Sequence, residues 1–178
     1  MLYTRQGDSG ATFTCPAGSR VSKRSKLIEA LGALDEINSW LGFCKARLPE
    51  EVGSLKDIIH GLQEDLFIVQ AELAGADKTI TADKVKRMEV LTDQIEQQLP
   101  KINTFFIAGE TEISASLDVA RALARRAERR VVDAVEAGEA QVGNDTKAFL
   151  NRLSSVLYVL VRFANHKLGV TEKSPTYR

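Results

Sequence analysis

Apolar side chains recur every three or four residues through most of the chain, which is the spacing of one face of an α-helix. Five stretches show this pattern: 26–47, 52–74, 82–99, 112–137 and 145–168. A proline or glycine follows each stretch within two residues: Pro49, Gly75, Pro100, Gly138 and Gly169. The pattern therefore predicts five long helices joined by short links.

Five long helices with short connections favour an all-α fold, a five-helix antiparallel bundle in a ferritin-like up-and-down arrangement. We expect no di-metal site, because His60 and His166 have no cysteine or carboxylate partner at ligand spacing. The sequence shows no strand-like alternation of apolar and polar residues, so we expect no sheet. The whole chain, 1–178, is interpreted as a single domain. It comprises an N-terminal arm (1–25), the bundle (26–169) and a polar tail (170–178).

Composition excludes several classes of partner. Lysine plus arginine and aspartate plus glutamate both total 24, so no global field attracts nucleic acid or an anionic membrane. No apolar run approaches the ~18 residues of a membrane span, and the first 15 residues contain no signal segment. We expect a cytoplasmic protein with reduced thiols at Cys15 and Cys44.

A basic cluster stands out against this neutral background, RALARRAERR at 121–130. With ~100° per residue, one helix face carries Arg121, Arg125 and Glu128, and an adjacent stripe carries Arg126, Arg129 and Arg130. A solvated surface is one interpretation. The exclusive use of arginine favours the other, a site for phosphate or carboxylate, because crowded guanidinium groups repel unless an anion offsets them.

The segment TRQGDSGAT, residues 4–12, is a second candidate for phosphate binding. Gly7 and Gly10 allow successive backbone N–H groups to face one concavity. Asp8 could bind Mg²⁺ through oxygen, and Lys23 could add a positive charge. No Walker motif is present, so an ordinary turn is the alternative.

A third candidate lies in FLNRLSSVLY, residues 149–158. Asn151, Ser155 and Tyr158 share one helix face, and an amide there can bind a base or a ribose hydroxyl. An exposed polar stripe is the alternative.

Taken in order, these segments resemble the PduO-type ATP:cob(I)alamin adenosyltransferases. The matching segments are TRQGDSGAT, RVSK (20–23), EALGALDEINSWLG (29–42), FFIAGE (105–110), SLDVARALARRAERRV (116–131) and FLNRLSSVLYVLVR (149–162). The resemblance spans nearly the whole chain and is most specific around RRAER and LNRLS.

The resemblance implies a homotrimer of five-helix bundles with active sites between subunits. It implies transfer of the 5′-deoxyadenosyl group from ATP to cob(I)alamin, with release of triphosphate and assistance from Mg²⁺. A cobalamin reductase and an adenosylcobalamin-dependent acceptor enzyme are the implied protein partners. Two alternatives remain: a non-catalytic ATP-binding sensor or assembly protein of the same fold, and an adenosyltransferase for a different corrinoid.

The resemblance also implies roles for individual residues. ATP would contact Thr4, Arg5, Gly7, Asp8, Gly10, Thr12, Lys23, Arg125, Arg126, Glu128, Arg129 and Asn151. Arg125, Arg129 and Glu128 would act in catalysis, with Asp8 and Glu128 on Mg²⁺. Phe106, or its neighbour Phe105, would displace the lower axial ligand of cobalt. Arg121 would pair with Asp35 across the subunit interface.

Four places depart from the family's usual pattern. Ala108-Gly109-Glu110 replaces a Pro-Gly-Gly-like turn, Asp118 replaces histidine, and Ser155 replaces aspartate. Arg24 and Ser25 follow Lys23 where acidic residues are frequent in the family. The segments implied for the nucleotide therefore match the family better than those implied for the corrinoid.

Overall fold

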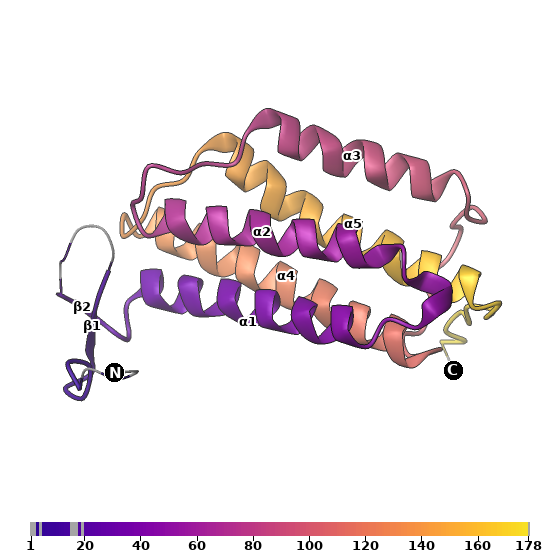
Figure 1. Cartoon of the computed structure of the whole chain (residues 1–178), viewed down its shortest axis with the longest axis horizontal. Helices are drawn as coiled ribbons and strands as arrows, with labels where there is room; N and C mark the ends of the chain where they lie inside the picture. The colour runs from indigo at the N-terminus through magenta and orange to yellow at the C-terminus, as the bar shows by residue number, and fades with distance from the viewer. Residues whose placement is uncertain (1–2, 4, 15–17, 19, 178) are drawn as a thin grey trace.

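The computed structural model describes residues 3, 5–14, 18 and 20–177. Within them the chain forms five long helices: α1 (Lys26–Ala46), α2 (Leu55–Leu73), α3 (Ala82–Glu96), α4 (Glu112–Glu136) and α5 (Asn144–Lys167). Successive helices run in opposite directions along one common axis (Figure 1). The predicted five-helix bundle is confirmed.

Helix α4 lies at the centre of the bundle. It packs between α1 and α5, while α2 packs on α1 and α3 packs on α5. Small buried side chains let the neighbouring helices approach α4 closely: Ala120, Ala124, Ala127 and Ala134. Larger apolar residues of α1 and α5, such as Leu34, Leu41 and Leu157, complete the core. This packing fixes the direction in which the polar face of α4 points.

The helix ends differ slightly from the predicted ones. A single 3₁₀ turn, η1 (Glu50–Val52), precedes α2, which begins three residues later than its apolar pattern. Helix α3 ends at Glu96, because Leu99 N bonds to Glu96 O in a three-residue turn. The predicted link at 101–110 contains no helix or strand.

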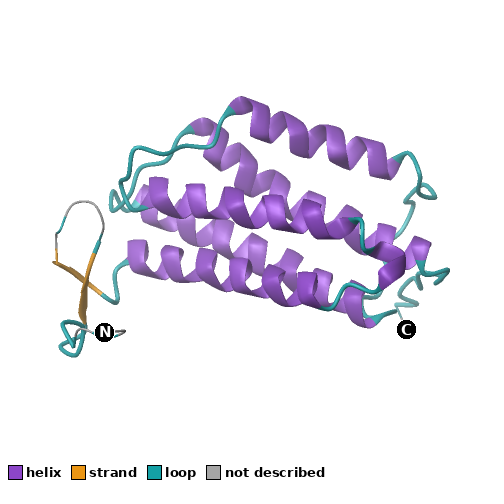
Figure 2. Ribbon diagram, viewed as in Figure 1, coloured by secondary structure: helices purple, strands orange, loops and turns teal. Residues whose placement is uncertain are grey.

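The expectation of no sheet was wrong. Strand β1 (Ala11–Phe13) pairs antiparallel with β2 (Arg20–Ser22), with Thr12 opposite Val21. Strands of three residues are too short to show a period-two pattern in the sequence. The hairpin extends beyond the end of α1, off the helical bundle (Figure 2).

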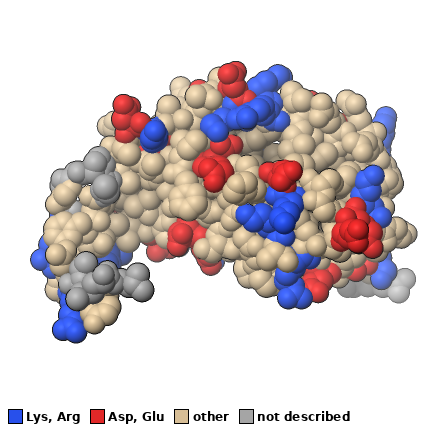
Figure 3. All heavy atoms as spheres, in the orientation of Figure 1, with Lys and Arg blue, Asp and Glu red and all other residues tan. Residues whose placement is uncertain are grey.

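On the face shown in Figure 3, acidic and basic side chains form small groups that lie next to one another, with uncharged surface between the groups. This agrees with the equal totals of the two charge types in the sequence. Among the described helices, none is long and apolar enough to cross a lipid bilayer.

The Cys44 thiol is free and lies within the core. Burial raises the pKa of this thiol to about 11, so it carries almost no thiolate at neutral pH. Cys15 lies outside the described residues.

Candidate active site

The basic cluster of α4 lines a hollow that we call the basic hollow. It has a volume of about 550 Å³ and combines α4 with one residue of α5. Its lining consists of Arg125, Arg126, Glu128, Arg129, Arg130, Val132, Asp133 and Asn151. The packing of α5 on α4 thus brings Asn151 to the predicted arginines.

Two arginines of the basic hollow are already neutralised. Arg126 forms an ion pair with Glu36 of α1. Arg130 Nε lies 3.3 Å from Glu29 Oε1, also on α1. Because α1 packs directly on α4, its acidic residues offset this side of the cluster.

The other two arginines of the hollow have no such partner. Among the described residues, neither Arg125 nor Arg129 forms a hydrogen bond or an ion pair. They lie one helical turn apart and face the same hollow. Two unpaired guanidinium groups at this spacing can bind one anion with several oxygens, such as a polyphosphate.

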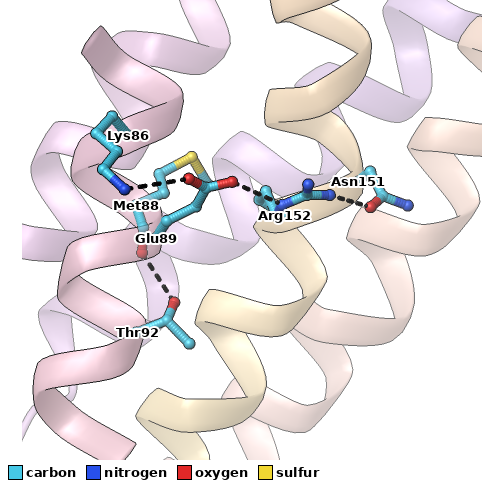
Figure 4. A network of polar contacts seen from close by, with 6 residues as sticks. All are labelled: Lys86, Met88, Glu89, Thr92, Asn151 and Arg152. Atoms are coloured by element: carbon cyan, nitrogen blue, oxygen red, sulfur yellow. Dashed lines mark hydrogen bonds and ion pairs between the residues drawn. The ribbon is translucent and has the colours of Figure 1, made fainter. Parts of the chain in front are cut away.

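A chain of polar contacts holds the opposite wall of the basic hollow (Figure 4). Asn151 Nδ2 donates to Glu128 Oε1 at 3.0 Å, and Arg152 Nη1 donates to Asn151 Oδ1 at 2.6 Å. Arg152 Nε in turn donates to Glu89 Oε1 of α3 at 3.2 Å, and Lys86 lies 4.0 Å from Glu89. These contacts fix the amide orientation of Asn151 and hold Glu128 at the hollow.

A second hollow of about 330 Å³, the middle hollow, lies between the same two helices and α3. Ser155 and Tyr158, two members of the predicted polar stripe of α5, line it. Arg125 lines both this hollow and the basic hollow, and Arg121 lines its other end.

The link at 101–110 covers a third space, the aromatic cavity, of about 500 Å³. Phe105, Phe106, Asp118 and Tyr158 line it, and Arg121 joins it to the middle hollow. The three spaces therefore follow one another along α4 and α5, and neighbouring spaces share Arg125 or Arg121. We call this series the trough; it is basic at one end and aromatic at the other.

The two phenylalanines of the aromatic cavity differ in environment. Phe105 is 77% exposed. Phe106 is half-buried, and the guanidinium carbon of Arg162 lies 5.4 Å from the centroid of its ring. The ring of Phe105 is therefore accessible to a ligand, while the ring of Phe106 packs against Arg162 of its own chain.

Arg121 is held at the junction of the two spaces by its own helix. Its Nε donates to Asp118 Oδ1 at 2.9 Å, and its guanidinium lies 5.9 Å from the centroid of the Tyr158 ring. Burial, and next the charge of Glu172, raise the pKa of Tyr158, which keeps its phenolic proton at neutral pH. Asp35 is exposed on α1, and its pairing with Arg121 of another subunit stays a prediction.

The N-terminal hairpin assembles part of the second predicted phosphate site. Lys23 N donates to Gly10 O at 2.9 Å, and Gly10 N donates to Gly7 O at 3.2 Å. Gly10 has a φ of +81°, which side chains disfavour. A Cβ on Gly7 would lie 3.0 Å from Lys23 Nζ, so the ammonium group sits directly against this turn.

The remaining arm residues surround the same turn. Arg5 and Asp8 are exposed, Thr12 belongs to β1, and Thr4 lies outside the described residues. The hairpin stands beyond the end of the bundle (Figure 1). One chain therefore does not bring Asp8 of the arm and Glu128 of α4 to a common site.

A buried polar group behind the aromatic cavity was not predicted from the sequence. Arg162 of α5 is 3% exposed, and its Nε donates to Glu172 Oε2 at 3.0 Å. A signal was present, because a single arginine in the apolar run VLYVLVRFA requires a buried partner. The partner lies in a tail described only as polar, and nothing local in the sequence connects the two.

The family described as "Cobalamin adenosyltransferase" matches residues 2–164. The Corrinoid adenosyltransferase PduO of Salmonella typhimurium is 35% identical over 170 residues, which cover 90% of this chain and 48% of the relative. This chain thus spans about half the length of that relative.

Other relatives match over more of their length. The Corrinoid adenosyltransferase of Mycobacterium leprae is 36% identical, with 92% of this chain and 91% of the relative covered. Corrinoid adenosyltransferase MMAB of Homo sapiens is 34% identical, with 97% and 72% covered.

A solved structure shares the whole fold. It is a variant PduO-type ATP:corrinoid adenosyltransferase from Lactobacillus reuteri complexed with cobalamin and ATP. It is 27% identical, with a TM-score of 0.93 over 99% of this chain and 97% of that chain. With a family match over most of its residues and relatives of this similarity, the chain belongs to the cobalamin adenosyltransferase family.

Proposed function

We propose that this protein transfers the 5′-deoxyadenosyl group of ATP to the cobalt of cob(I)alamin, forming adenosylcobalamin and releasing triphosphate. The observation that carries the proposal is the trough, which joins two unpaired arginines, Arg125 and Arg129, to an aromatic cavity with an exposed Phe105. The names of the relatives, and the ATP and cobalamin bound in the Lactobacillus reuteri structure, support this assignment.

The triphosphate would lie in the basic hollow. Arg125 and Arg129 would bind it with both guanidinium groups, since neither has a partner among the described residues. Arg126 would contribute less, because Glu36 already neutralises it. Asn151 would contact the nucleoside from the opposite wall, with its orientation fixed by Glu128 and Arg152.

Magnesium fits this site as an ion carried by the nucleotide. No group of three or more His, Cys, Asp or Glu in the described part of the chain could hold a metal alone. Mg²⁺ is commonly bound by one or two carboxylates together with substrate phosphates. Glu128 faces the hollow and would supply one carboxylate. Asp8 would supply another from the arm of a second subunit, since one chain does not bring the two residues together. When bound, the ion would neutralise part of the phosphate charge.

The corrinoid would occupy the aromatic cavity. Its reduction to the Co(I) state is easier when the lower axial ligand is absent, and an apolar ring can take the place of that ligand. We assign this part to Phe105 rather than Phe106, because Phe105 presents its ring and Phe106 packs on Arg162.

The reaction requires positioning and charge neutralisation rather than proton transfer. The cobalt of cob(I)alamin is the nucleophile and forms a bond to C5′ of the ribose. The C5′–O bond breaks, and its electron pair leaves with the triphosphate. Arg125 and Arg129 would stabilise the charge that develops on the leaving group, and the trough would hold cobalt and C5′ in line.

We further propose a homotrimer in which the arm of one subunit completes the site of its neighbour. The arm, which contains Gly7, Gly10 and Lys23, extends beyond the end of the helical bundle (Figure 2). A second copy placed against this end could bring its arginines to that arm. A cytoplasmic location, a cobalamin reductase and an adenosylcobalamin-dependent acceptor complete the proposal.

The activity can be tested directly by spectroscopy. Chemically reduced cob(I)alamin is mixed anaerobically with the protein, ATP and Mg²⁺, and the absorbance of light-sensitive adenosylcobalamin is followed. Product that depends on both protein and ATP supports the proposal. If the protein binds ATP but forms no product with either cobalamin or an incomplete corrinoid, the result would favour the ATP-binding sensor. Product with the incomplete corrinoid alone would indicate a different corrinoid substrate.

A further inference from the structure

We propose that Glu172, in the segment after α5, is a positioning residue that holds the link at 101–110 and thereby fixes Phe105 in the aromatic cavity. The assignment of a role in the reaction rests on the proposed function. The physical claim, that Glu172 orders this link, can be tested without turnover.

Glu172 is anchored on α5 by two buried residues. Its carboxylate accepts a hydrogen bond from Arg162 Nε at 3.0 Å and another from Asn165 Nδ2 at 3.3 Å. Arg162 and Asn165 are 3% and 4% exposed. A guanidinium so deeply buried needs its counter-charge, because water does not solvate it. Glu172 therefore connects the C-terminal segment to the bundle through its hydrogen bonds to Arg162 and Asn165.

Arg162 connects this anchor to the beginning of the link. Its Nη2 donates to the carbonyl oxygen of Pro100 at 2.9 Å. Its guanidinium also lies against the ring of Phe106. The position of Arg162 thus determines where the chain leaves α3 and where Phe106 packs.

The residue after Glu172 connects the anchor to the middle of the link. Ile107 N donates to Lys173 O at 2.8 Å, and Lys173 Nζ lies 3.8 Å from Glu110 Oε2. Glu110 is one of the positions where this chain departs from its family's usual turn. The link is therefore held on two sides, and Phe105 lies between the held positions with its ring exposed to the cavity.

Glu172 also lines the aromatic cavity together with Asn165. Asn165 Oδ1 is buried and accepts no hydrogen bond within the described residues. The contact with Glu172 therefore orients this amide without help from a second partner. Loss of the carboxylate charge should disturb the wall of the cavity and the link together, while the basic hollow keeps all of its own contacts.

The test compares three full-length variants with the wild type. Glu172→Gln removes the charge at constant size, and Glu172→Asp keeps the charge on a shorter side chain. Glu136→Gln is the matched control, because Glu136 is exposed at the end of α4. Amide hydrogen exchange of peptides covering residues 102–109 is measured first, without ligands. We expect exchange about tenfold faster in Glu172→Gln, partial recovery in Glu172→Asp, and no change in the control.

The second measurement is the electron paramagnetic resonance signal of four-coordinate cob(II)alamin at saturating ATP. We expect Glu172→Gln to reduce this signal about tenfold, while the KM for ATP changes by less than about twofold. Equal exchange in Glu172→Gln and wild type would overturn the proposal. Faster exchange with an undiminished signal would overturn the role in positioning Phe105.

The two proposals fail in different ways. If the wild type forms no adenosylcobalamin, the proposed function fails, while the exchange experiment still decides whether Glu172 orders the link. If Glu172→Gln does not fold, the test uses Glu172→Asp instead. The proposal would be contradicted if this variant lowered the electron paramagnetic resonance signal while the amide exchange of residues 102–109 stayed at the wild-type rate.

Discussion

At the residue scale, the arginines of α4 differ in what already neutralises them. Arg126 and Arg130 meet acidic residues of α1. Arg125 and Arg129 have no such partner among the described residues. A guanidinium that makes no contact in its own chain has most to gain from a bound anion. The four residues should therefore contribute unequally to ATP binding, although they are chemically identical.

Arg125→Ala should raise the Kd for ATP about ten- to hundredfold, because a hydrogen bond between charged groups contributes roughly 1.5–3 kcal/mol. Arg129→Ala should act similarly, and Arg126→Ala should have a smaller effect. Calorimetric titration with ATP measures all three. Arg87→Ala on α3 is the matched control, since Arg87 is exposed there and lines a hollow on another part of the surface. An ATP affinity unchanged in both Arg125→Ala and Arg129→Ala would contradict the phosphate site.

The adjacent phenylalanines give a second prediction at this scale. Phe105→Ala should slow the reaction from cob(II)alamin about ten- to hundredfold more than the reaction from preformed cob(I)alamin, because the ring buries its apolar surface against the corrinoid. Phe106→Ala should affect both reactions to a similar degree, since its ring packs on Arg162. Initial rates from the two oxidation states measure the difference. The opposite result would return the assignment to Phe106.

At the element scale, groups at the N-terminal ends of two helices donate hydrogen bonds to the carboxylates of distant residues. Glu72 of α2 accepts from Gly143 N at 2.7 Å and from the hydroxyl of buried Thr146, both at the start of α5. Glu139, which follows α4, accepts from Leu27 N at 3.1 Å in α1. Carboxylates at these positions also interact favourably with the helix dipole. Glu72 of α2 thus holds the N-terminal end of α5, the helix that carries Asn151, Tyr158 and Arg162.

Glu72→Ala should lower the free energy of unfolding by about 1–2 kcal/mol, because α5 loses its capping carboxylate and Thr146 loses its acceptor. Urea denaturation at one fixed protein concentration measures the change. Glu64→Ala on the same helix is the control, since Glu64 is exposed and its one ion pair within the described part of the chain is with His60 at 3.9 Å. The control should change stability by less than about 0.5 kcal/mol. Equal midpoints for the two variants would show that Glu72 does not cap α5.

At the scale of the whole molecule, the arm and the basic hollow lie on separate parts of one chain. The arm is a short hairpin beyond the end of the bundle, whereas the hollow belongs to α4 and α5 (Figure 2). A complete site in a homotrimer would combine the arm of one subunit with the hollow of the next. Cyclic symmetry then places three equivalent sites between subunits.

Mixed trimers test this arrangement. Lys23→Ala impairs the arm and Arg125→Ala impairs the hollow, so each variant alone should be nearly inactive. Subunits unfolded together and refolded as a 1:1 mixture should recover about a quarter of wild-type activity, since a quarter of the interfaces combine two intact halves by random assortment. Mixing without exchange of subunits is the control and should recover nothing. If the refolded mixture is no more active than the Lys23→Ala and Arg125→Ala variants alone, the result would contradict a site shared between subunits.

Much of this protein was determined by local sequence. The five helices followed from apolar residues at three- and four-residue steps, because burial of one helix face requires that period. The arginines of α4 and Asn151 of α5 were recognised as candidates by residue type and spacing. All of these residues except Arg121 line one hollow. The hairpin was missed, since three-residue strands are stabilised by pairing and leave no period in the sequence.

Tertiary structure decided which of these residues are available. Glu36 and Glu29 neutralise two of the arginines only because α1 packs on α4. The guanidinium of Arg162 contacts the ring of Phe106 only because the link crosses the end of α5. The partnership of Glu172 with Arg162 joins an apolar helix to a polar tail. Local sequence determines the period, burial and chemical type of each side chain. Its partners depend on distances between segments far apart in the chain, which only the packed helices establish.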